Sequence, residues 1–339
     1  MSFINKLLAT PSYGWQDEKG ELVVPTNREL FREAFSRVNI FRSRKNWMSA
    51  LSVLMIVAML PFLYLFITEY FSWPLLGLIL AYSLVVMGVH GTVWFHRYCT
   101  HRAYRFSHPV FRFITQHLVI KTLPEEVYVI SHHVHHAKSD QPGDPYNSRG
   151  GLWYCMLAEF NHQRVNPDLS ETEYNKAARL MQHTGVEVNS YQQYQQWGSV
   201  AHPLYTIATW LFNWFSWYAV LYLIGGHALG CAVFSSALLW FVGVRAFNYT
   251  GHAKGKEKHV DGLDFDRSNL SVNQTRPGLF TGEWHNNHHL YPGSARAGFL
   301  RYQFDPAWVF IFCMYKIGVV SSYHDSKKEF LKRYMGRHQ

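Results

Sequence analysis

The stretch that decides the fold runs from Asn46 to Phe95 and reads NWMSALSVLMIVAMLPFLYLFITEYFSWPLLGLILAYSLVVMGVHGTVWF. It contains no lysine or arginine, and Glu69 is its only acidic residue. A helix needs about 20 apolar residues to cross a bilayer, so this stretch is long enough for two crossings joined by a tight turn. We therefore predict transmembrane helices over about residues 47–67 and 73–95.

A second apolar stretch, from Pro203 to Val244, contains no Asp, Glu, Lys or Arg at all and is interrupted by Gly225-Gly226. It predicts a second helical hairpin, with crossings over about residues 203–224 and 228–247. Both hairpin turns lack positive charge, whereas the lysines and arginines lie in the other segments. By the positive-inside rule, we expect both termini and every long polar segment on the cytoplasmic side.

The polar segments complete the domain plan. Residues 1–45 have no signal-peptide core and are expected to form an N-terminal cytoplasmic or interfacial segment. An apolar stripe from Val110 to Val119 suits an interfacial helix, and the run from Ala307 to Val320 is too short to cross. We expect an all-α membrane protein with four spans as two hairpins. The predicted units are a membrane domain over 46–322, with a cytoplasmic helical cap made of 96–202 and 248–322, and a tail over 323–339.

Composition supports a membrane protein. Only 16% of the 339 residues are charged, against about a quarter in an ordinary soluble domain, and 17% are aromatic. This excludes a disordered chain and makes nucleic acid an unsuitable partner, because the net charge of +9 is explained by cytoplasmic basic residues facing anionic lipid. The four cysteines form no C-x-x-C pair, so neither a disulfide framework nor an iron–sulfur or zinc-ribbon site is indicated.

The chain has 20 histidines, and many of them gather in three windows: HRYCTH at 96–101, HHVHH at 132–136 and HNNHH at 285–289. In the second and third windows, histidines three and four residues apart share one face of a helix. The pair in the first window is five residues apart, about 140° on an ideal α-helix, so these two would bind different metals or straddle a helix end. Because the windows offer eight well-spaced imidazoles, more than one ion can use, we predict two metals held by the cytoplasmic cap.

Imidazole ligands do not name the metal, since iron, copper, nickel and zinc all accept them. A hydrolytic zinc centre would need a general base, for which Glu283 is the only candidate close in sequence. An oxygen-activating iron pair would instead need an apolar channel for an unreactive substrate, which the aromatic-rich crossings can supply. A metal transporter or sensor is the alternative from another class, but the predicted crossings carry few ionisable groups.

Together, the three windows resemble the histidine boxes of the membrane fatty-acyl desaturases, the stearoyl-CoA desaturase-like family and its bacterial branch. DPYNSRG at 144–150 is similar to a run that follows the second box in that family, and HLYPGSAR at 289–296 is similar to the bacterial continuation of the third. The likeness also extends to the four-span layout and to the order of the boxes. It implies an integral membrane enzyme, here of a bacterial inner membrane, with its active site on the cytoplasmic side.

The resemblance implies two irons, O2 as co-substrate, and a ninth ligand from the motif Asn248-Tyr-Thr-Gly-His252. Carried over residue by residue, the implied metal ligands are His96, His101, His132, His135, His136, His252, His285, His288 and His289. Asn248 would lie beside the metals, and His133 would not be a ligand. The implied reaction is the O2-dependent introduction of a cis double bond into a long acyl chain. A related hydroxylase, acetylenase or terminal-alkene-forming oxygenase remains the alternative, because the same oxidant can give other products.

The resemblance also implies partners. Animal-type enzymes carry a charged pair before the second box where this chain has Ile130 and Ser131, so acyl-CoA, a carrier-protein-linked chain and a lipid-linked chain all stay open as substrates. Oxygen reduction needs electrons that the acyl chain does not supply, so a separate ferredoxin-like or cytochrome donor with its reductase is expected, docked on a basic cytoplasmic face. Further residues expected to contact substrate or support the site are Tyr128, Asp144, Asn147, Arg149 and Trp153.

Overall fold

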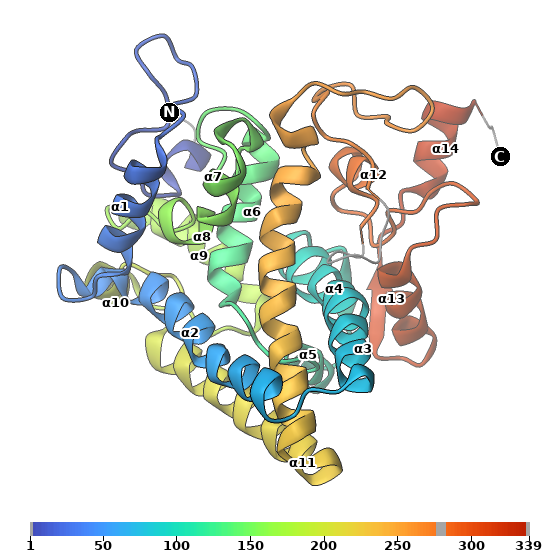
Figure 1. Ribbon diagram of the computed structural model, residues 1–339. Helices are drawn as coiled ribbons and strands as arrows, with labels where there is room; N and C mark the ends of the chain where they lie inside the picture. The colour runs from blue at the N-terminus through green and yellow to red at the C-terminus, as the bar shows by residue number, and fades with distance from the viewer. Residues whose placement is uncertain (1–2, 276–282, 337–339) are drawn as a thin grey trace.

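The two apolar stretches form the longest helices of the protein (Figure 1). The computed structural model describes residues 3–275 and 283–336. Three helical segments are long and apolar enough to cross a membrane: Arg44–Thr68, which contains α2 (Trp47–Thr68), then Trp73–Thr100 and Pro203–Thr250. The second segment is continuous but changes its winding, from α3 (Trp73–Ala81) through η3 (Tyr82–Met87) and α4 (Gly88–Gly91) to η4 (Thr92–Thr100), where η3 and η4 are π-helical.

The third segment, α11 (Pro203–Thr250), is sharply bent at its two central glycines. Gly226 has a φ of 66°, a left-handed conformation that is favourable only for glycine, and Gly225 is also non-helical. The two arms then pack side by side, because the ring of Tyr218 lies 5.8 Å from that of Phe234 and its hydroxyl lies 2.7 Å from Nδ1 of His227. The Gly-Gly break predicted from the sequence is therefore the turn between two adjacent arms (Figure 1).

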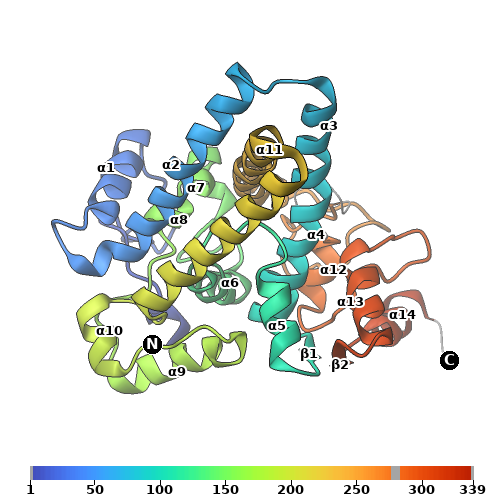
Figure 2. The same cartoon turned by 90° about the horizontal axis from the view of Figure 1, so that it is seen from below.

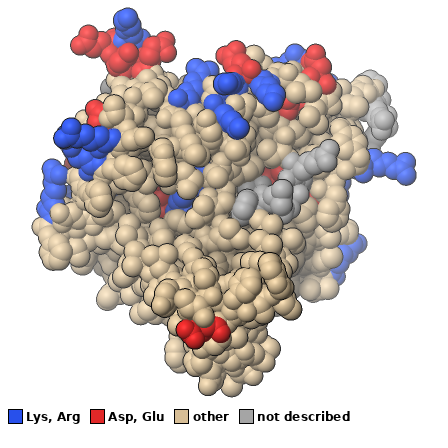
Figure 3. Space-filling model, viewed as in Figure 1, with Lys and Arg blue, Asp and Glu red and all other residues tan. Residues whose placement is uncertain are grey.

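The apolar helices pack on one another through aromatic side chains. Phe62 of α2 lies 4.5 Å, between ring centroids, from Phe234 of α11. Other apolar side chains on these helices face outward, among them Leu223 and Ile224, which are 83% and 73% exposed. In Figure 3 the lower half of the molecule is almost bare of charged side chains, whereas lysines, arginines and acids gather at the upper end. This division of charge suits a protein whose lower half faces hydrocarbon.

The remaining helices cover the upper end of the apolar bundle (Figure 1). They are short, and several begin with side-chain caps, such as the capping box of Thr26 and Glu29 at the start of α1. Their bounds are α1 Asn27–Val38, α5 Pro109–Gln116, α6 Glu125–Lys138, α7 Leu152–Met156, α8 Ala158–Asn161, α9 Glu171–Met181, α10 Tyr191–Trp197, α12 His285–Leu290, α13 Pro306–Lys316 and α14 Lys327–Met335. Single 3-10 turns are η1 Phe3–Lys6, η2 Arg44–Asn46, η5 Ser148–Gly150, η6 Gln182–Thr184 and η7 Ala253–Gly255.

The expectation of an all-α fold needs one correction, because the structure also contains a small antiparallel sheet. β1 (Tyr104–Phe106) pairs with β2 (Val320–Tyr323), with Tyr104 opposite Tyr323. Strands of three and four residues are too short to show an alternating pattern, so the sequence carries no signal for them. The sheet joins the segment after η4 to the chain beyond α13, and Figure 2 shows β1 and β2 beside α5 and α13.

Candidate metal centre

Nine histidines from four parts of the chain meet at the upper end of the apolar bundle. Two come from the π-helical end of the second apolar segment, three from α6, one from the turn after α11, and three from α12. Five of them, His96, His101, His132, His136 and His288, have ring nitrogens within 4.8 Å of one another, and so do His135, His252 and His289. The Nε2 atoms of His285 and His252 are 3.1 Å apart, which places the ninth ring beside the second group.

Because residues five apart diverge on an α-helix, sequence reasoning expected His96 and His101 either to bind different metals or to straddle a helix end, and His101 does lie just beyond the end of η4. The structure places both in the same five-histidine group, with ring centroids 5.0 Å apart. The reason is the π-helical winding of η4, in which the amide of His101 donates to the carbonyl of His96 at 3.1 Å, an i to i+5 hydrogen bond. This wider turn brings residues five apart onto one face, so the first window contributes two imidazoles to a single centre.

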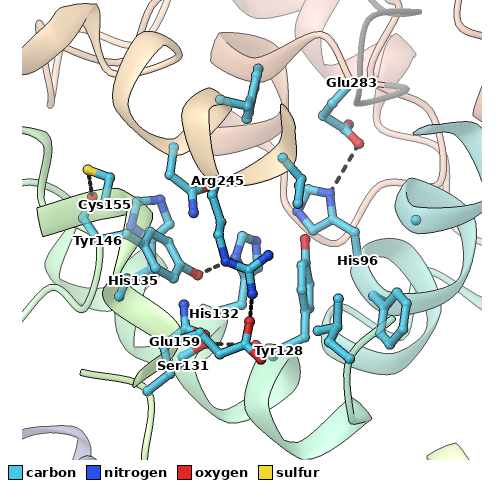
Figure 4. A pocket seen from close by; sticks show the side chains of 18 of the residues that line it. His96, Tyr128, Ser131, His132, His135, Tyr146, Cys155, Glu159, Arg245 and Glu283 are labelled. Carbon is cyan, nitrogen blue, oxygen red and sulfur yellow. Dashed lines mark hydrogen bonds and ion pairs between the residues drawn. The ribbon is translucent and has the colours of Figure 1, made fainter. Parts of the chain in front are cut away.

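Carboxylates hold the outer nitrogens of several rings. Nδ1 of His252 lies 2.8 Å from Asp140, and Nδ1 of His135 lies 3.0 Å from both oxygens of Asp144. Burial acts to raise the pKa of Asp140, but His252 and Ser271 outweigh it and lower that pKa, so Asp140 is an ionised carboxylate. Because a carboxylate can only accept, the proton of His252 is on Nδ1 and the lone pair of its Nε2 points toward the neighbouring histidines. Similarly, Nδ1 of His96 is 3.2 Å from Glu283 (Figure 4).

The ring nitrogens that point into the cluster are better placed to bind a metal than to hydrogen-bond to one another. Within the described part of the chain, the buried Nε2 atoms of His96, His101 and His289 have no hydrogen-bond partner. Burial lowers the pKa of most of these imidazoles well below its usual value, and neighbouring histidines lower it further, so the rings stay neutral; this applies to His101, His132, His135, His136, His285, His288 and His289. Inward lone pairs on neutral, buried rings are the donor set that divalent iron or zinc takes.

His252 differs from the other rings because it faces a carboxylate directly. Burial alone would lower the pKa of His252, but the charge of Asp140 and its hydrogen bond outweigh burial and raise that pKa. Asp140 also accepts from Ser148 at 3.0 Å and from the side chains of Asn269 and Ser271, so its position is determined by several neighbours. Asp140 therefore orients a predicted ligand and connects it to two other segments, η5 and the loop that contains Asn269 and Ser271.

Sequence reasoning named Asp144 as a supporting residue but missed the other members of this layer. Asp140 and Tyr146, whose hydroxyl lies 2.7 Å from Nδ1 of His132, follow the second histidine window in one polar turn, and that closeness was the available signal. Arg97 gave no such signal: it is fully buried and donates to Glu283 at 3.1 Å and to Asp305 at 3.0 Å. Glu283, considered above as a general base, instead pairs with this guanidinium, which lowers the pKa of its carboxyl although burial acts to raise it.

A cavity opens beside the histidines, and Figure 4 shows its lining. Apolar side chains of η4 and of the second arm of α11 form one part of it, including Phe95, Trp240 and Val244. The remainder is polar and contains a buried ion pair between Arg245 of α11 and Glu159 of α8. The cavity thus joins the metal-ligand candidates to a slot whose walls can accept a hydrocarbon chain.

The predicted supporting residues divide into two sets. Tyr128 and Asn248 line the cavity, and the ring of Tyr128 stacks 5.0 Å from that of His132. Asp144 and Asn147 are buried supports: Asp144 holds His135, and the side chain of Asn147 donates to the carbonyl of Gln141.

Arg149 and Trp153 lie elsewhere. The Arg149 side chain is half exposed, 3.7 Å from Glu257. Trp153 is 48% exposed, packs on Phe31 and does not line the cavity that the described residues form. His133, predicted not to bind metal, belongs to neither histidine group, and its ring centroid is 6.4 Å from that of His101.

Comparisons with known proteins agree with this site. The chain is 25% identical over 297 residues to an icosanoyl-CoA 5-desaturase of Limnanthes douglasii, covering 83% of this chain and 72% of that protein. It is 25% identical to an sn-1 stearoyl-lipid 9-desaturase of Synechocystis sp. (76% of this chain, 72% of that one) and 27% identical to a hex-5-enoyl-[acyl-carrier protein] acetylenase of Moorena producens (72% and 75%). The family model described as fatty acid desaturase matches residues 71–308, and the chain therefore belongs to the fatty acid desaturase family.

Proposed function

We propose that this protein is an integral-membrane di-iron acyl desaturase, which uses O2 to introduce a cis double bond into a long acyl chain. The observation that carries the proposal is the set of nine imidazoles beside an apolar cavity in a chain of the desaturase family. Membership of the family makes the protein an oxidoreductase that acts on acyl substrates. The iron pair, the ligand assignment and the double bond are our inference from this arrangement.

We assign the nine histidines to two irons. One iron would be held by the five-histidine group, and the other by His135, His252, His285 and His289. Bound iron supplies the oxygen chemistry that removes hydrogen from methylene groups, whose C–H bonds no protein base can deprotonate. Asn248 lies in the cavity wall near His252 and is suited to hold a water beside the metals.

The chain's own residues position the substrate. Phe95 and Trp240 confine a hydrocarbon chain laterally, and Tyr128 lies between that chain and the rings of His96 and His132. Holding two adjacent methylenes at the metals determines which bond is oxidised, because a shift of one carbon gives a different product.

We infer four membrane crossings arranged as two hairpins. The bend at Gly225-Gly226 supports this count, because it divides α11 into two arms that are each long enough to span. With the predicted charge asymmetry, both termini and the metal centre would lie on the cytoplasmic side of a bacterial inner membrane. The proposed units remain residues 1–45, a desaturase domain over 46–322 and a tail over 323–339; residues 276–282 and 337–339 lie outside the described part of the chain.

The acyl carrier and the electron donor are further parts of the proposal. The named relatives use CoA-linked, lipid-linked and carrier-protein-linked chains, so each of these is a candidate substrate form. Desaturation consumes O2, the two hydrogens of the substrate, two further electrons and two protons, and releases two waters. A ferredoxin-like or cytochrome donor with its reductase would supply those electrons, and an acidic donor would suit the basic cytoplasmic end.

A second candidate reaction comes from one relative. The Moorena producens protein is named an acetylenase. This relative supports a second reaction for our protein, in which an existing double bond of the acyl chain is oxidised instead of a saturated C–C bond. Hydroxylation or formation of a terminal alkene would use the same centre. Metal transport is less suited, because the nine histidines gather at one end of the bundle instead of along a path through it.

The test is reconstitution of the full chain with ferrous iron, a ferredoxin, its reductase and NADPH. Stearoyl-CoA, a stearoyl-carrier protein and stearoyl phospholipid would each be offered, with products identified by mass spectrometry. We expect at least one substrate to lose two hydrogens; gain of an oxygen atom would favour a hydroxylase. No turnover on any saturated or monounsaturated chain by iron-loaded protein would contradict the proposal.

A matched pair of variants tests the ligand assignment. His288→Ala removes a member of the five-histidine group and should lower iron content and abolish turnover. His133→Ala removes a histidine of the second window that belongs to neither group, and it should retain both iron and turnover. Iron is measured by plasma emission spectrometry on protein of verified folding. Equal loss of iron in the two variants would refute the assignment.

A further inference from the structure

A second cavity, of about 390 Å³, lies on the other side of the first histidine window from the substrate cavity. It is enclosed by the end of η4, β1, the start of α5 and η6, and none of the nine metal-ligand candidates lines it. Its lining is strongly basic and aromatic: Tyr98, Arg102, Tyr104, Arg105, Phe106, Ser107, His108, Pro109, Arg112 and His183. The proposed reaction makes no use of this cavity.

Three arginines face this space without an acidic partner. Among residues 3–275 and 283–336, no carboxylate forms an ion pair with Arg102, Arg105 or Arg112. Arg102 donates to the carbonyl of Arg179, which leaves its positive charge uncompensated. Burial and the guanidinium of Arg102 lower the pKa of His183 to about 4, so this ring adds no negative or positive charge at neutral pH. The cavity therefore has a positive potential that an anion would neutralise.

The geometry of the cavity suits a phosphate group in particular. A guanidinium presents its N–H groups as a planar fork that matches the oxygens of phosphate. Arg102, Arg105 and Arg112 all line this cavity, so three such forks are available to one anion.

The surroundings of the cavity are apolar and exposed. On α5, Val110, Phe113 and Ile114 are 52%, 47% and 52% exposed, and their spacing places them on one stripe of the helix. An exposed apolar stripe on a short helix suits the plane of a membrane interface. With α5 in that position, the basic cavity at its start would lie near the lipid head groups.

We propose that this cavity binds the phosphate of an anionic phospholipid, whose acyl chains lie along the apolar stripe of α5. Charge complementarity selects the head group, and the adjacent stripe selects a lipid over a free phosphate ion. This site is separate from the metal centre and goes beyond the proposed reaction, because it gives the cap a lipid contact that does not depend on iron or substrate.

The experiment is native mass spectrometry of the full chain in detergent, titrated with phosphatidylglycerol, phosphatidylcholine or inorganic phosphate. We compare the wild type with Arg105→Gln/Arg112→Gln and with the matched control Lys328→Gln/Lys332→Gln, which removes two charges from α14. Phosphatidylglycerol should bind the wild type and the control equally, and bind the arginine variant about tenfold or more weakly. Phosphatidylcholine should bind more weakly than phosphatidylglycerol to the wild type.

Three results would overturn the proposal. Phosphatidylglycerol binding could weaken equally in the arginine variant and in the control, or it could weaken in neither. Inorganic phosphate could also compete fully with the lipid. A fourth contrary result is unchanged lipid binding with slower reduction by the electron donor, which would make the cavity a protein docking site. Arg105→Gln alone, at an exposed position, keeps the test valid if the double variant folds poorly. Its thermal midpoint without lipid reports folding.

Discussion

Replacing Arg245 by methionine should destabilise the protein strongly, and a second change should restore it. Arg245 and Glu159 are 6% and 5% exposed and pair with each other inside the substrate cavity. The guanidinium also donates to the carbonyl of Phe241 at 2.9 Å and lies over its ring. Arg245→Met leaves the Glu159 carboxylate buried without its cation, whereas Arg245→Met/Glu159→Gln removes both charges.

The expected loss of stability follows from the burial of the two charges. Breaking a buried ion pair by removing one partner costs about 3–5 kcal/mol, while replacing both partners by neutral groups of similar volume costs less than about 1.5 kcal/mol. For 339 residues, an unfolding entropy of about 2.1 cal/mol/K per residue gives about 0.7 kcal/mol per kelvin. The midpoint of thermal unfolding should therefore fall by about 4–7 °C in the single variant and by about 2 °C or less in the double variant.

The assay is thermal unfolding in detergent, followed by tryptophan fluorescence at one protein concentration. Glu159→Gln alone completes the double-mutant cycle, and it should also be strongly destabilised because it leaves Arg245 unpaired. If the double variant is as unstable as Arg245→Met, the two side chains are not coupled and the reasoning is refuted. Turnover of the double variant then reports whether the pair also contacts the polar head of the substrate, which would appear as a raised KM.

Three further predictions concern other parts of the structure. Asp140→Asn should weaken iron binding about 10–100-fold in a metal titration, because the tautomer of His252 loses its carboxylate partner. Burial raises the pKa of Glu126 to about 8, so the folded state holds this proton more tightly than the unfolded state does. The free energy of unfolding should therefore fall as pH rises from about 4.5 to about 8. Thermal unfolding of Glu126→Gln, followed over the same pH range, should lack this slope. Gly91→Ala places a Cβ 2.7 Å from Cζ2 of Trp240, so the indole ring must move. Residues 91 and 240 both line the cavity, so kcat/KM should fall most for the longest acyl chains in a chain-length series.

The helices that form the apolar bundle could be predicted from local patterns. Long uncharged runs and a Gly-Gly break are properties of neighbouring residues, so the helix starts at Trp47, Trp73 and Pro203 agree closely with expectation. The histidine windows were visible for the same reason, since spacing along one helix needs no knowledge of the rest of the fold. The ninth imidazole, His252, was found only through the family resemblance, because it stands alone in the sequence.

Other features depend on contacts between distant residues. The sheet pairs Tyr104 with Tyr323, and neither strand is long enough to reveal itself. Arg97 joins Glu283 and Asp305 through bonds across about half the chain, and no local pattern marks a buried arginine. Trp153 was expected to contact substrate or support the site, but α7 packs against α1 and leaves this side chain about half exposed beside Phe31.

The sequence by itself determined which segments are apolar enough to enter a membrane and which imidazoles can share a helix face, because hydrophobicity and helical periodicity are local. Only the tertiary structure decided that His96 and His101 face one centre, through a π-helical turn. It also decided which carboxylates orient the rings and where three arginines gather around one cavity. These are pairings of charge and hydrogen bonds between segments far apart in the chain, and they exist only once the helices have packed.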